Sequence, residues 1–190
     1  MRDSSEYVVP IFAFGTGEDG AETRRFIGSG FFVRSPETII SCRHVLEKPS
    51  AQEISFRTYH FKSNSWHEIS DIWLHPKMDI AIGTTKEFGA KVWRPFTGTL
   101  TLGGDVSVFS YLEDDLGGRV AILPSTSKGY IVNQPVGLNA MVGMGVYTLS
   151  FPSLPGFSGS PVEVFDSSCF VGMLFNNRQT DITVFSFEEV

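Results

Sequence analysis

Ser158 stands in the stretch PGFSGSPV, residues 155–162, whose glycine and proline residues favour a bent backbone. These residues suit an ordinary tight turn, but they also suit a turn that presents a nucleophilic serine. A serine hydroxyl is a weak nucleophile at neutral pH, so acyl-transfer chemistry needs a base beside it and a third group that orients the base. It also needs backbone N–H groups aimed at the developing oxyanion, which a tight turn with glycine can supply. Four histidines could act as the base, and all of them precede the serine: His44, His60, His67 and His75.

The order of these groups along the chain excludes two known arrangements of a catalytic serine. An α/β-hydrolase has its serine in G-x-S-x-G and its acid and histidine afterwards, whereas here position 160 is serine and no histidine follows Ser158. An order of acid, histidine and serine fits poorly, because only Asp3 and Asp19 among the aspartates precede His44. The order histidine, aspartate, serine remains.

Local context favours His44 as the base and Asp79 as the acid. His44 lies in TIISCRHVLE, where a predicted strand ends in a short helical turn, and Asp79 lies in HPKMDIAI, where a turn leads into an apolar strand. The steps are 35 residues from His44 to Asp79 and 79 more to Ser158. Asp79 could instead cap the start of its strand, because other aspartates also lie between the histidine and the serine: Asp71, Asp105, Asp114 and Asp115.

Composition and charge narrow the classes of protein to which the chain can belong. The net charge is −6 and the basic residues are scattered, so we expect no nucleic-acid partner, which would need a basic stripe. No apolar run approaches the roughly 18 to 20 residues of a membrane span, so we expect no membrane partner. The two cysteines, Cys42 and Cys169, fit a reducing compartment, so we expect a cytoplasmic protein. Cys42 and His44 lack a second pair at ligand spacing, so we expect no metal and no cofactor.

The sequence predicts that the elements that position these residues are β-strands. Runs such as YVVPIFAF, RRFIGSGFFVR and DVSVFSYL are separated by turn signals, and no window keeps a helical period over ten residues. CRHVLEK predicts one short helical turn. Some dozen short strands indicate an all-β sandwich or closed barrels, with a division between two sets of strands near residues 86–104.

The ordered segments GSGFFV, IISCRHV, HPKMDIAI and PGFSGSPV resemble the trypsin- and chymotrypsin-like serine peptidases. The disulfide-poor branch, with bacterial trypsin-like and HtrA-type proteases, is the most similar, and the resemblance covers about residues 8–187. It implies two packed antiparallel six-stranded β-barrels with the active site in the cleft between them. We therefore expect a single peptidase domain, 1–190, with an N-terminal barrel at 8–85, a connector at 86–104 and a C-terminal barrel at 105–187.

The resemblance also assigns roles to residues. It makes His44 the general base, Asp79 the acid that orients its ring, and Ser158 the nucleophile. The N–H groups of Gly156 and Ser158 would form the oxyanion hole. Two positions depart from the family pattern: Phe157 replaces the acid that trypsin-like zymogens keep just before the serine, and Ser160 stands where glycine is usual. Activation by a buried N-terminal ion pair is therefore not expected.

The same resemblance places the substrate pocket along two segments. The pocket would be lined by Ser150, Phe151, Pro152 and Ser153, and by Phe175, Asn176 and Asn177. Pro152 occupies the position six residues before Ser158 where trypsin-type basic specificity uses an acid, so we expect an uncharged residue before the cleaved bond. An extended substrate would pair through its backbone with the strand edge near Asn176.

The sequence therefore predicts a cytoplasmic serine endopeptidase that acts on protein or peptide substrates through an acyl-enzyme. The absence of a zymogen device favours control by a partner chain or an attached domain. Two alternatives stay open. One is a latent or inactive double-barrel protein that binds peptides, and the other is an esterase that uses the same three residues.

Overall fold

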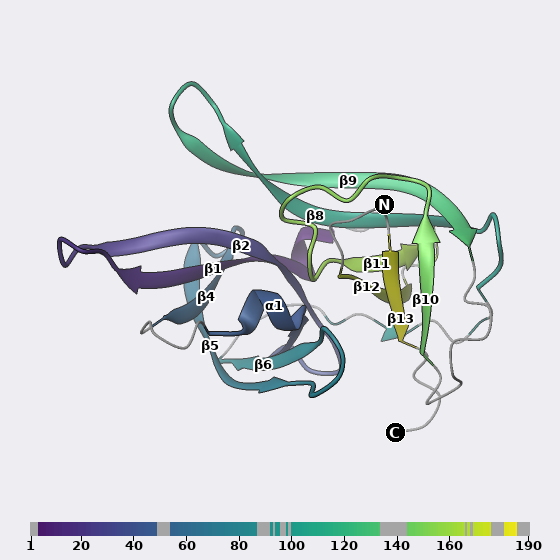
Figure 1. Cartoon of the computed structure of the whole chain (residues 1–190), viewed down its shortest axis with the longest axis horizontal. Helices are drawn as coiled ribbons and strands as arrows, with labels where there is room; N and C mark the ends of the chain where they lie inside the picture. Colours follow the sequence, from purple (N-terminus) through teal and green to yellow (C-terminus); the bar gives the residue numbers. More distant parts are fainter. Residues whose placement is uncertain are drawn as a thin grey trace.

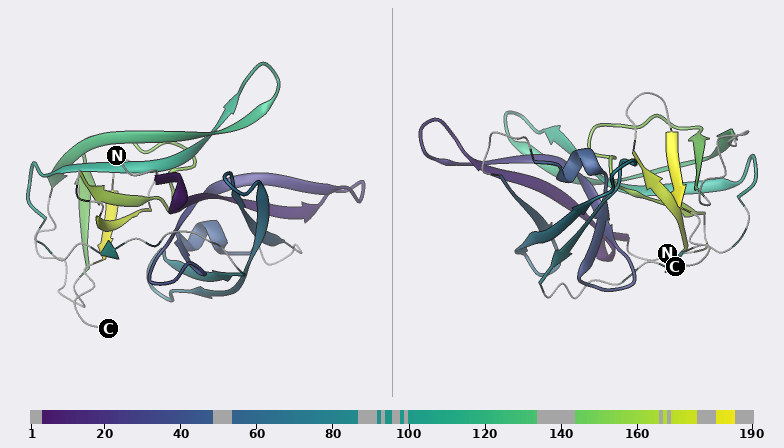
Figure 2. Two further views of the ribbon diagram at one scale, coloured as in Figure 1. Left: turned by 180° about the vertical axis from the view of Figure 1, so that it is seen from behind. Right: turned by 60° about the horizontal axis from the view of Figure 1, so that its bottom comes forward.

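Strands form nearly all of the regular secondary structure in the computed structural model, which describes residues 4–48, 54–86, 92, 94–95, 98, 100–133, 144–165, 167, 169–175 and 181–185. The described helices are the 3-10 helix η1 (Ser4–Glu6) and the α-helix α1 (Arg43–Leu46), which confirms the predicted helical turn. The strands form two groups that lie side by side, as Figures 1 and 2 show. No helix within the described ranges is long and apolar enough to cross a membrane.

The first group is a closed barrel in the order β1-β2-β3-β6-β5-β4. All of its neighbouring strands pair antiparallel. Its register shifts between Ile11 and Phe12, which is typical of a β-bulge in a strongly curved strand. The strands are β1 (Val8–Thr16), β2 (Glu22–Phe32), β3 (Thr38–Ser41), β4 (Ser55–His60), β5 (Ser65–Leu74) and β6 (Ala81–Thr85).

The second group has the order β11-β8-β9-β10-β13-β12-β7, and β11 also pairs with β12. Six antiparallel strands therefore follow one another in a ring of pairings, while the short β7 adds to β12 in parallel. This arrangement matches the predicted all-β fold of two barrels. The strands are β7 (Arg94–Pro95), β8 (Asp105–Asp115), β9 (Val120–Asn133), β10 (Met144–Leu149), β11 (Pro161–Val164), β12 (Cys169–Leu174) and β13 (Asp181–Phe185).

The β8–β9 hairpin is longer than the sequence pattern indicates. The apolar runs at 119–123 and 128–134 predict two strands, whereas β9 is continuous from Val120 to Asn133 and includes Pro124, which lies opposite Tyr111. Most of β9 is exposed, so polar residues replace the apolar alternation that would mark a buried strand. The predicted boundaries at 8–85, 86–104 and 105–187 stay a prediction, because much of the connector lies outside the described residues.

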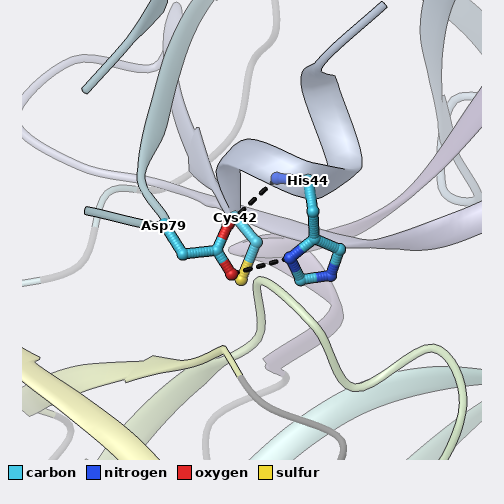
Figure 3. A group of neighbouring side chains, drawn as sticks. All are labelled: Cys42, His44 and Asp79. Atoms are coloured by element: carbon cyan, nitrogen blue, oxygen red, sulfur yellow. Dashed lines mark hydrogen bonds and ion pairs between the residues drawn. The ribbon is translucent and has the colours of Figure 1, made fainter. Parts of the chain in front are cut away.

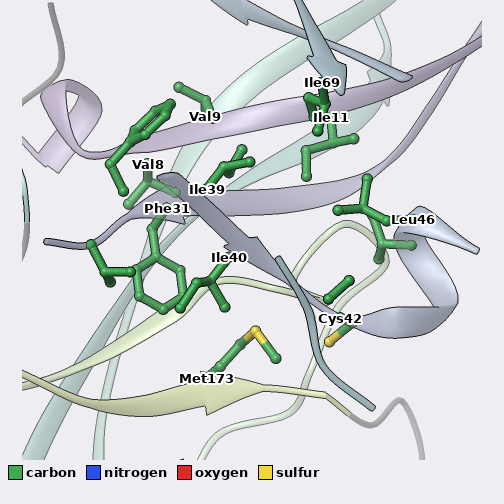
Figure 4. Packing of buried hydrophobic residues seen from close by; sticks show 14 of the residues in the cluster. Val8, Val9, Ile11, Phe31, Ile39, Ile40, Cys42, Leu46, Ile69 and Met173 are labelled. Carbon is green, nitrogen blue, oxygen red and sulfur yellow. The ribbon is translucent and has the colours of Figure 1, made fainter. Parts of the chain in front are cut away.

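Apolar packing continues from one barrel into the other. The first buried cluster, part of which Figure 4 shows, contains Phe31 and Ile40 of the first barrel together with Phe170 and Met173 of β12. The rings of Phe31 and Phe170 meet edge to face at 5.3 Å between centroids. A second cluster fills the other barrel and includes Phe157, whose side chain is fully buried. Truncating a buried phenylalanine to alanine costs about 3–5 kcal/mol, so the first cluster, which contains residues of both barrels, contributes to holding them together.

Candidate active site

His44 and Asp79 are joined by two hydrogen bonds. The ring Nδ1 of His44 lies 2.6 Å from Asp79 Oδ2, and the backbone N–H of His44 donates to Asp79 Oδ1 over 2.9 Å. Figure 3 shows the carboxylate facing both groups, with the histidine at the first turn of α1. A carboxylate bound to Nδ1 keeps the proton on that nitrogen and leaves Nε2 as the basic nitrogen.

The carboxyl of Asp79 is held in its ionised form. Partial burial alone would raise its pKa, but the hydrogen bonds from the side chain and backbone of His44 outweigh that effect, so the pKa lies below the ordinary value. The side chain of Asp79 is 28% exposed and that of His44 is 50% exposed. The pair is therefore open to solvent on the histidine side and screened on the carboxylate side.

The turn before Asp79 is fixed by a second histidine. The ring Nδ1 of His75 accepts the N–H groups of Lys77 and Met78 over 3.1 and 2.9 Å. The guanidinium of Arg43, next to His44, donates to the His75 carbonyl over 3.1 Å. His75 is thus a turn residue, and it connects the turn that carries Asp79 to the helix that carries His44.

The loop that carries Ser158 packs directly on the first barrel. The carbonyl of Ser158 accepts the N–H of Ser29 in β2 over 2.9 Å. A Cβ added to Gly28 would lie 2.9 Å from both the Ser158 carbonyl oxygen and the Val45 side chain, so Ser158 and the residue after His44 adjoin the same glycine. Among the described residues, the half-buried Ser158 side chain forms no hydrogen bond with His44. The three predicted residues thus lie in one region, with one of the two expected side-chain contacts formed.

The two N–H groups predicted as oxyanion donors have no partner within the described part of the chain. Every other backbone N–H from Gly156 to Ser160 is bound: Phe157 donates to Leu154, Gly159 to Leu174 and Ser160 to Phe157. The carbonyls of Phe157, Ser158 and Ser160 are also paired. The N–H groups of Gly156 and Ser158 are therefore the two in this stretch without an acceptor among the described residues.

The predicted pocket residues occupy different environments. Ser150 is exposed, and its hydroxyl accepts the N–H of Tyr130 in β9 over 2.9 Å. Phe151 is buried in the second cluster, so its ring belongs to the core, while Pro152 is exposed and Ser153 is half-buried. Phe175 packs against the first cluster. Asn176 and Asn177 lie outside the described residues.

Sequence reasoning missed a hollow beside the loop. Its volume is about 490 Å³, and it adjoins Gly156 on one side. Its wall consists of apolar side chains from β2 and acidic side chains from β8. These residues are distant in the sequence, and they meet because β8 packs beside β2. The lining residues are Phe26, Ile27, Glu113, Asp114, Asp115, Val120, Pro155 and Gly156.

Cys42 is a further neighbour of the histidine–aspartate pair. Figure 3 shows its side chain next to those of His44 and Asp79. Its Sγ lies within 4.8 Å of the potential ligand atoms of both residues, and its thiol donates to the Leu174 carbonyl over 3.1 Å. Burial raises the pKa of this thiol, and the charge of Asp79 raises it further. The protonated thiol is a poor metal ligand, since metals bind the thiolate. Both Cys42 and Cys169 are free of disulfides.

Comparison with known proteins identifies the family. A family model described as "Trypsin-like peptidase domain" matches residues 28–173, which include His44, Asp79 and Ser158. The chain belongs to the trypsin-like peptidase domain family. It is thus a serine protease of trypsin-like type, as the resemblance of its sequence motifs implies. No curated protein sequence matches the chain.

Solved structures agree with the trypsin-like fold at low sequence identity. The Rv3671c protease from M. tuberculosis in its active form is 18% identical with a TM-score of 0.69, and the match covers 98% of this chain and 78% of that one. Deg5 is 16% identical with a TM-score of 0.67, and coverage is 94% and 83%. The HtrA-type protease AlgW, solved with a decapeptide, is 10% identical with a TM-score of 0.67, and coverage is 95% and 61%.

Proposed function

We propose that this trypsin-like peptidase domain is a serine endopeptidase that uses His44, Asp79 and Ser158. The observation that carries the proposal is the pair of hydrogen bonds from His44 to the ionised Asp79. Two further features support it. The Ser158 loop is bound to the first barrel through Ser29, and the N–H groups of Gly156 and Ser158 are unpartnered in the described part of the chain.

In the proposed acylation step, Ser158 Oγ attacks the carbonyl carbon of the scissile peptide bond while His44 Nε2 takes the hydroxyl proton. The carbonyl π electrons move to oxygen, and the N–H groups of Gly156 and Ser158 bind the oxyanion. Asp79 stabilises the imidazolium without taking its proton. When the C–N bond breaks, His44 gives the proton to the departing amine, and the acyl group stays on Ser158.

Deacylation repeats these steps with water. His44 Nε2 removes a proton from the water molecule as its oxygen attacks the acyl carbon, and the same N–H groups bind the second oxyanion. The bond to Ser158 Oγ then breaks, and His44 returns the proton to the serine. The products are an amine and a carboxylic acid, and the enzyme is unchanged.

Substrate preference and control are further parts of the proposal. With Pro152 in the predicted pocket segment, the residue before the cleaved bond is uncharged, and an extended protein or peptide substrate pairs with the edge near Asn176. Phe157 leaves no acid to receive a new N-terminus, so a partner chain or an attached domain controls the activity. We place this activity in the cytoplasm.

A second candidate is a latent peptide-binding protein that needs a partner before it turns over. One observation favours it, namely the lack of a described hydrogen bond between Ser158 and His44. Catalytic hydrogen bonds are often long or poorly aligned in a ligand-free enzyme, so the endopeptidase is the better supported function.

Digestion of unfolded casein separates these functions. The wild type should release new peptide N-termini, Ser158→Ala should release none, and mass spectrometry should find mainly uncharged residues before the cleaved bonds. Cleavage after Arg or Lys would contradict the proposed preference. Hydrolysis of p-nitrophenyl acetate without casein cleavage would favour an esterase, and loss of both activities in the wild type would favour the latent protein.

A further inference from the structure

Three buried serines from distant parts of the chain meet behind the Ser158 loop. Ser29 lies in β2 of the first barrel, Ser110 lies in β8 of the second, and Ser160 follows the loop just before β11. All three are 0% exposed. We call Ser29, Ser110 and Ser160 the serine cluster. A serine hydroxyl rarely gains from such burial unless it is hydrogen-bonded, so the partners of these groups indicate what the cluster does.

The hydroxyls converge on one backbone carbonyl. Ser29 Oγ donates to the Gly156 carbonyl over 2.9 Å, and Ser110 Oγ donates to the same oxygen over 3.1 Å. Ser160 Oγ donates to Ser110 Oγ over 2.8 Å. Ser110 Oγ also lies 3.2 Å from Ser29 Oγ and 3.4 Å from the Tyr111 carbonyl oxygen, so the Gly156 oxygen is the nearest of the three acceptors for its single proton. The Gly156 oxygen accepts two hydrogen bonds, which uses both of its lone pairs.

The cluster is held in place by the backbone around it. Ser29 Oγ accepts the N–H of Tyr111 over 3.4 Å, and the Ser29 carbonyl accepts the hydroxyl of Ser41 over 2.7 Å. Ser29 and Ser110 belong to different barrels, so the two donors meet only when the barrels pack together. The Gly156 carbonyl therefore receives both hydrogen bonds only when the two barrels are packed against each other.

These bonds fix two successive peptide planes of the loop, and the plane that carries the Gly156 N–H, Pro155–Gly156, joins the first of them at the Cα of Gly156. The Gly156–Phe157 plane is held by the two serines at its carbonyl and by the Leu154 carbonyl at its N–H. The next plane is held at the Phe157 carbonyl by the N–H of Ser160, and this plane carries the Ser158 N–H. The Phe157 side chain is buried in the second cluster on the same loop. The loop is therefore anchored by hydroxyls and by an aromatic ring.

We propose that the serine cluster positions the N–H groups of Gly156 and Ser158 for the oxyanion, in place of an ion pair at the position of Phe157. The inference rests on the proposed function, because it assigns a role within that reaction. The three serines are positioning residues: none of them touches the substrate, and each acts through the Gly156 carbonyl. Ser160, which departs from the glycine usual in the family, adds the third hydroxyl to the chain and donates to Ser110 Oγ.

Substitution of Ser110 tests the proposal most directly. Ser110→Ala leaves the Gly156 carbonyl with one donor and leaves the Ser160 proton without its acceptor. With p-nitrophenyl acetate we expect kcat to fall about 10- to 100-fold, somewhat less than removal of an oxyanion donor itself, while KM changes less than about twofold. Phenylboronic acid forms a tetrahedral adduct on a nucleophilic serine, so its inhibition constant should rise in parallel with the loss in kcat.

Ser160→Gly is the milder variant, and it tests the same proposal if Ser110→Ala does not fold. It should lower kcat by a few-fold, and the double variant should lose no more than Ser110→Ala alone, because the two hydroxyls act in series. Thr58→Val is the matched control. The Thr58 hydroxyl is also 0% exposed and also donates to a carbonyl, that of Pro10 over 2.9 Å, but it lies in the first barrel away from the loop. This control should lower the melting temperature and leave kcat unchanged.

The outcomes separate the inference from the function on which it rests. A wild type that neither hydrolyses p-nitrophenyl acetate nor reacts with a fluorophosphonate would overturn the proposed function and the inference with it. An active wild type whose Ser110→Ala and Ser160→Gly variants keep full kcat and full affinity for phenylboronic acid would overturn the inference alone. A fall in melting temperature without a fall in kcat would do the same, because it would mean that the cluster only stabilises the fold.

Discussion

Replacing Asp79 by asparagine removes the charge that holds His44 and keeps the shape of the site. The Oδ1 atom of Asp79 can still accept the backbone N–H of His44, a bond of 2.9 Å, so α1 should keep its position. The 2.6 Å contact to Nδ1 cannot survive in the same form, because an amide N–H in that place needs an acceptor. The ring must then move its proton to Nε2, and the nitrogen that we propose as the base for Ser158 can no longer accept a proton.

The loss in turnover should be large. The same change in a Ser-His-Asp triad lowers kcat by about 10⁴, which corresponds to about 5.5 kcal/mol of activation free energy. The stability of the fold should change by only about 1 kcal/mol, because one charge-assisted bond is lost at a partly exposed site. The assay is the initial rate of casein cleavage beside a thermal melt of each protein.

Asp71→Asn is the matched control for this substitution. Asp71 also lies between His44 and Ser158 in the sequence, and in the structure its carboxylate accepts a hydrogen bond from the hydroxyl of Thr84 in β6 over 2.9 Å. Its φ of 47° suits asparagine as well as aspartate. This control should keep full activity. Full activity in Asp79→Asn, or a 10⁴-fold loss in the Asp71 variant, would refute the assignment of the acid.

Three further predictions concern other residues. Burial raises the pKa of Glu163 to about 7, although a hydrogen bond from Ser4 opposes the shift. Between pH of about 4.5 and about 7 the folded protein therefore binds a proton that the unfolded chain has released. The free energy of unfolding accordingly falls as the pH rises through this range. Glu163→Gln should remove this decline and add about 1 kcal/mol at pH 8 after allowance for solvent screening, and parallel melts at pH 5 and pH 8 would check it. Gly159 has a φ of +85°, and a Cβ added to it would overlap the Ser29 carbonyl. Gly159→Ala should therefore lower the free energy of unfolding in urea by more than the roughly 1–3 kcal/mol expected from backbone strain alone. A loss below about 1 kcal/mol would contradict the packing of the loop. Native Cys42 should resist Ellman's reagent at pH 8 and react after unfolding, because its buried thiol has a raised pKa; rapid reaction of the native thiol would contradict this environment.

The fold and the histidine–aspartate pair could be predicted because both depend on local patterns. The strands of the first barrel are marked in the sequence by apolar and β-branched residues between turn signals. The order of histidine, aspartate and serine limits the possible arrangements of a catalytic serine to one. His44 and Asp79 could be chosen because each stands at the boundary of a predicted strand. The structure brings them together over 35 residues through the pairing of β3 with β6.

Other features depend on contacts between distant segments and leave no local signal. The serine cluster joins residues 29, 110 and 160 from two barrels, and a serine in a strand looks the same in the sequence whether it is buried or exposed. Phe151 belongs to the predicted pocket segment, and its side chain packs into the second cluster among residues that are distant in the sequence. The hollow beside Gly156 likewise arises only from the packing of β8 beside β2.

Fluorophosphonate labelling tests the central claim most directly, because the reagent forms a bond only with an activated serine hydroxyl. The labelled protein is digested, and the modified residue is located by mass spectrometry. We predict one adduct at Ser158 in the wild type and none in Ser158→Ala or His44→Ala, with both variants folded by thermal melt. An adduct on another serine, or equal labelling of Ser158 in the His44→Ala protein, would contradict it.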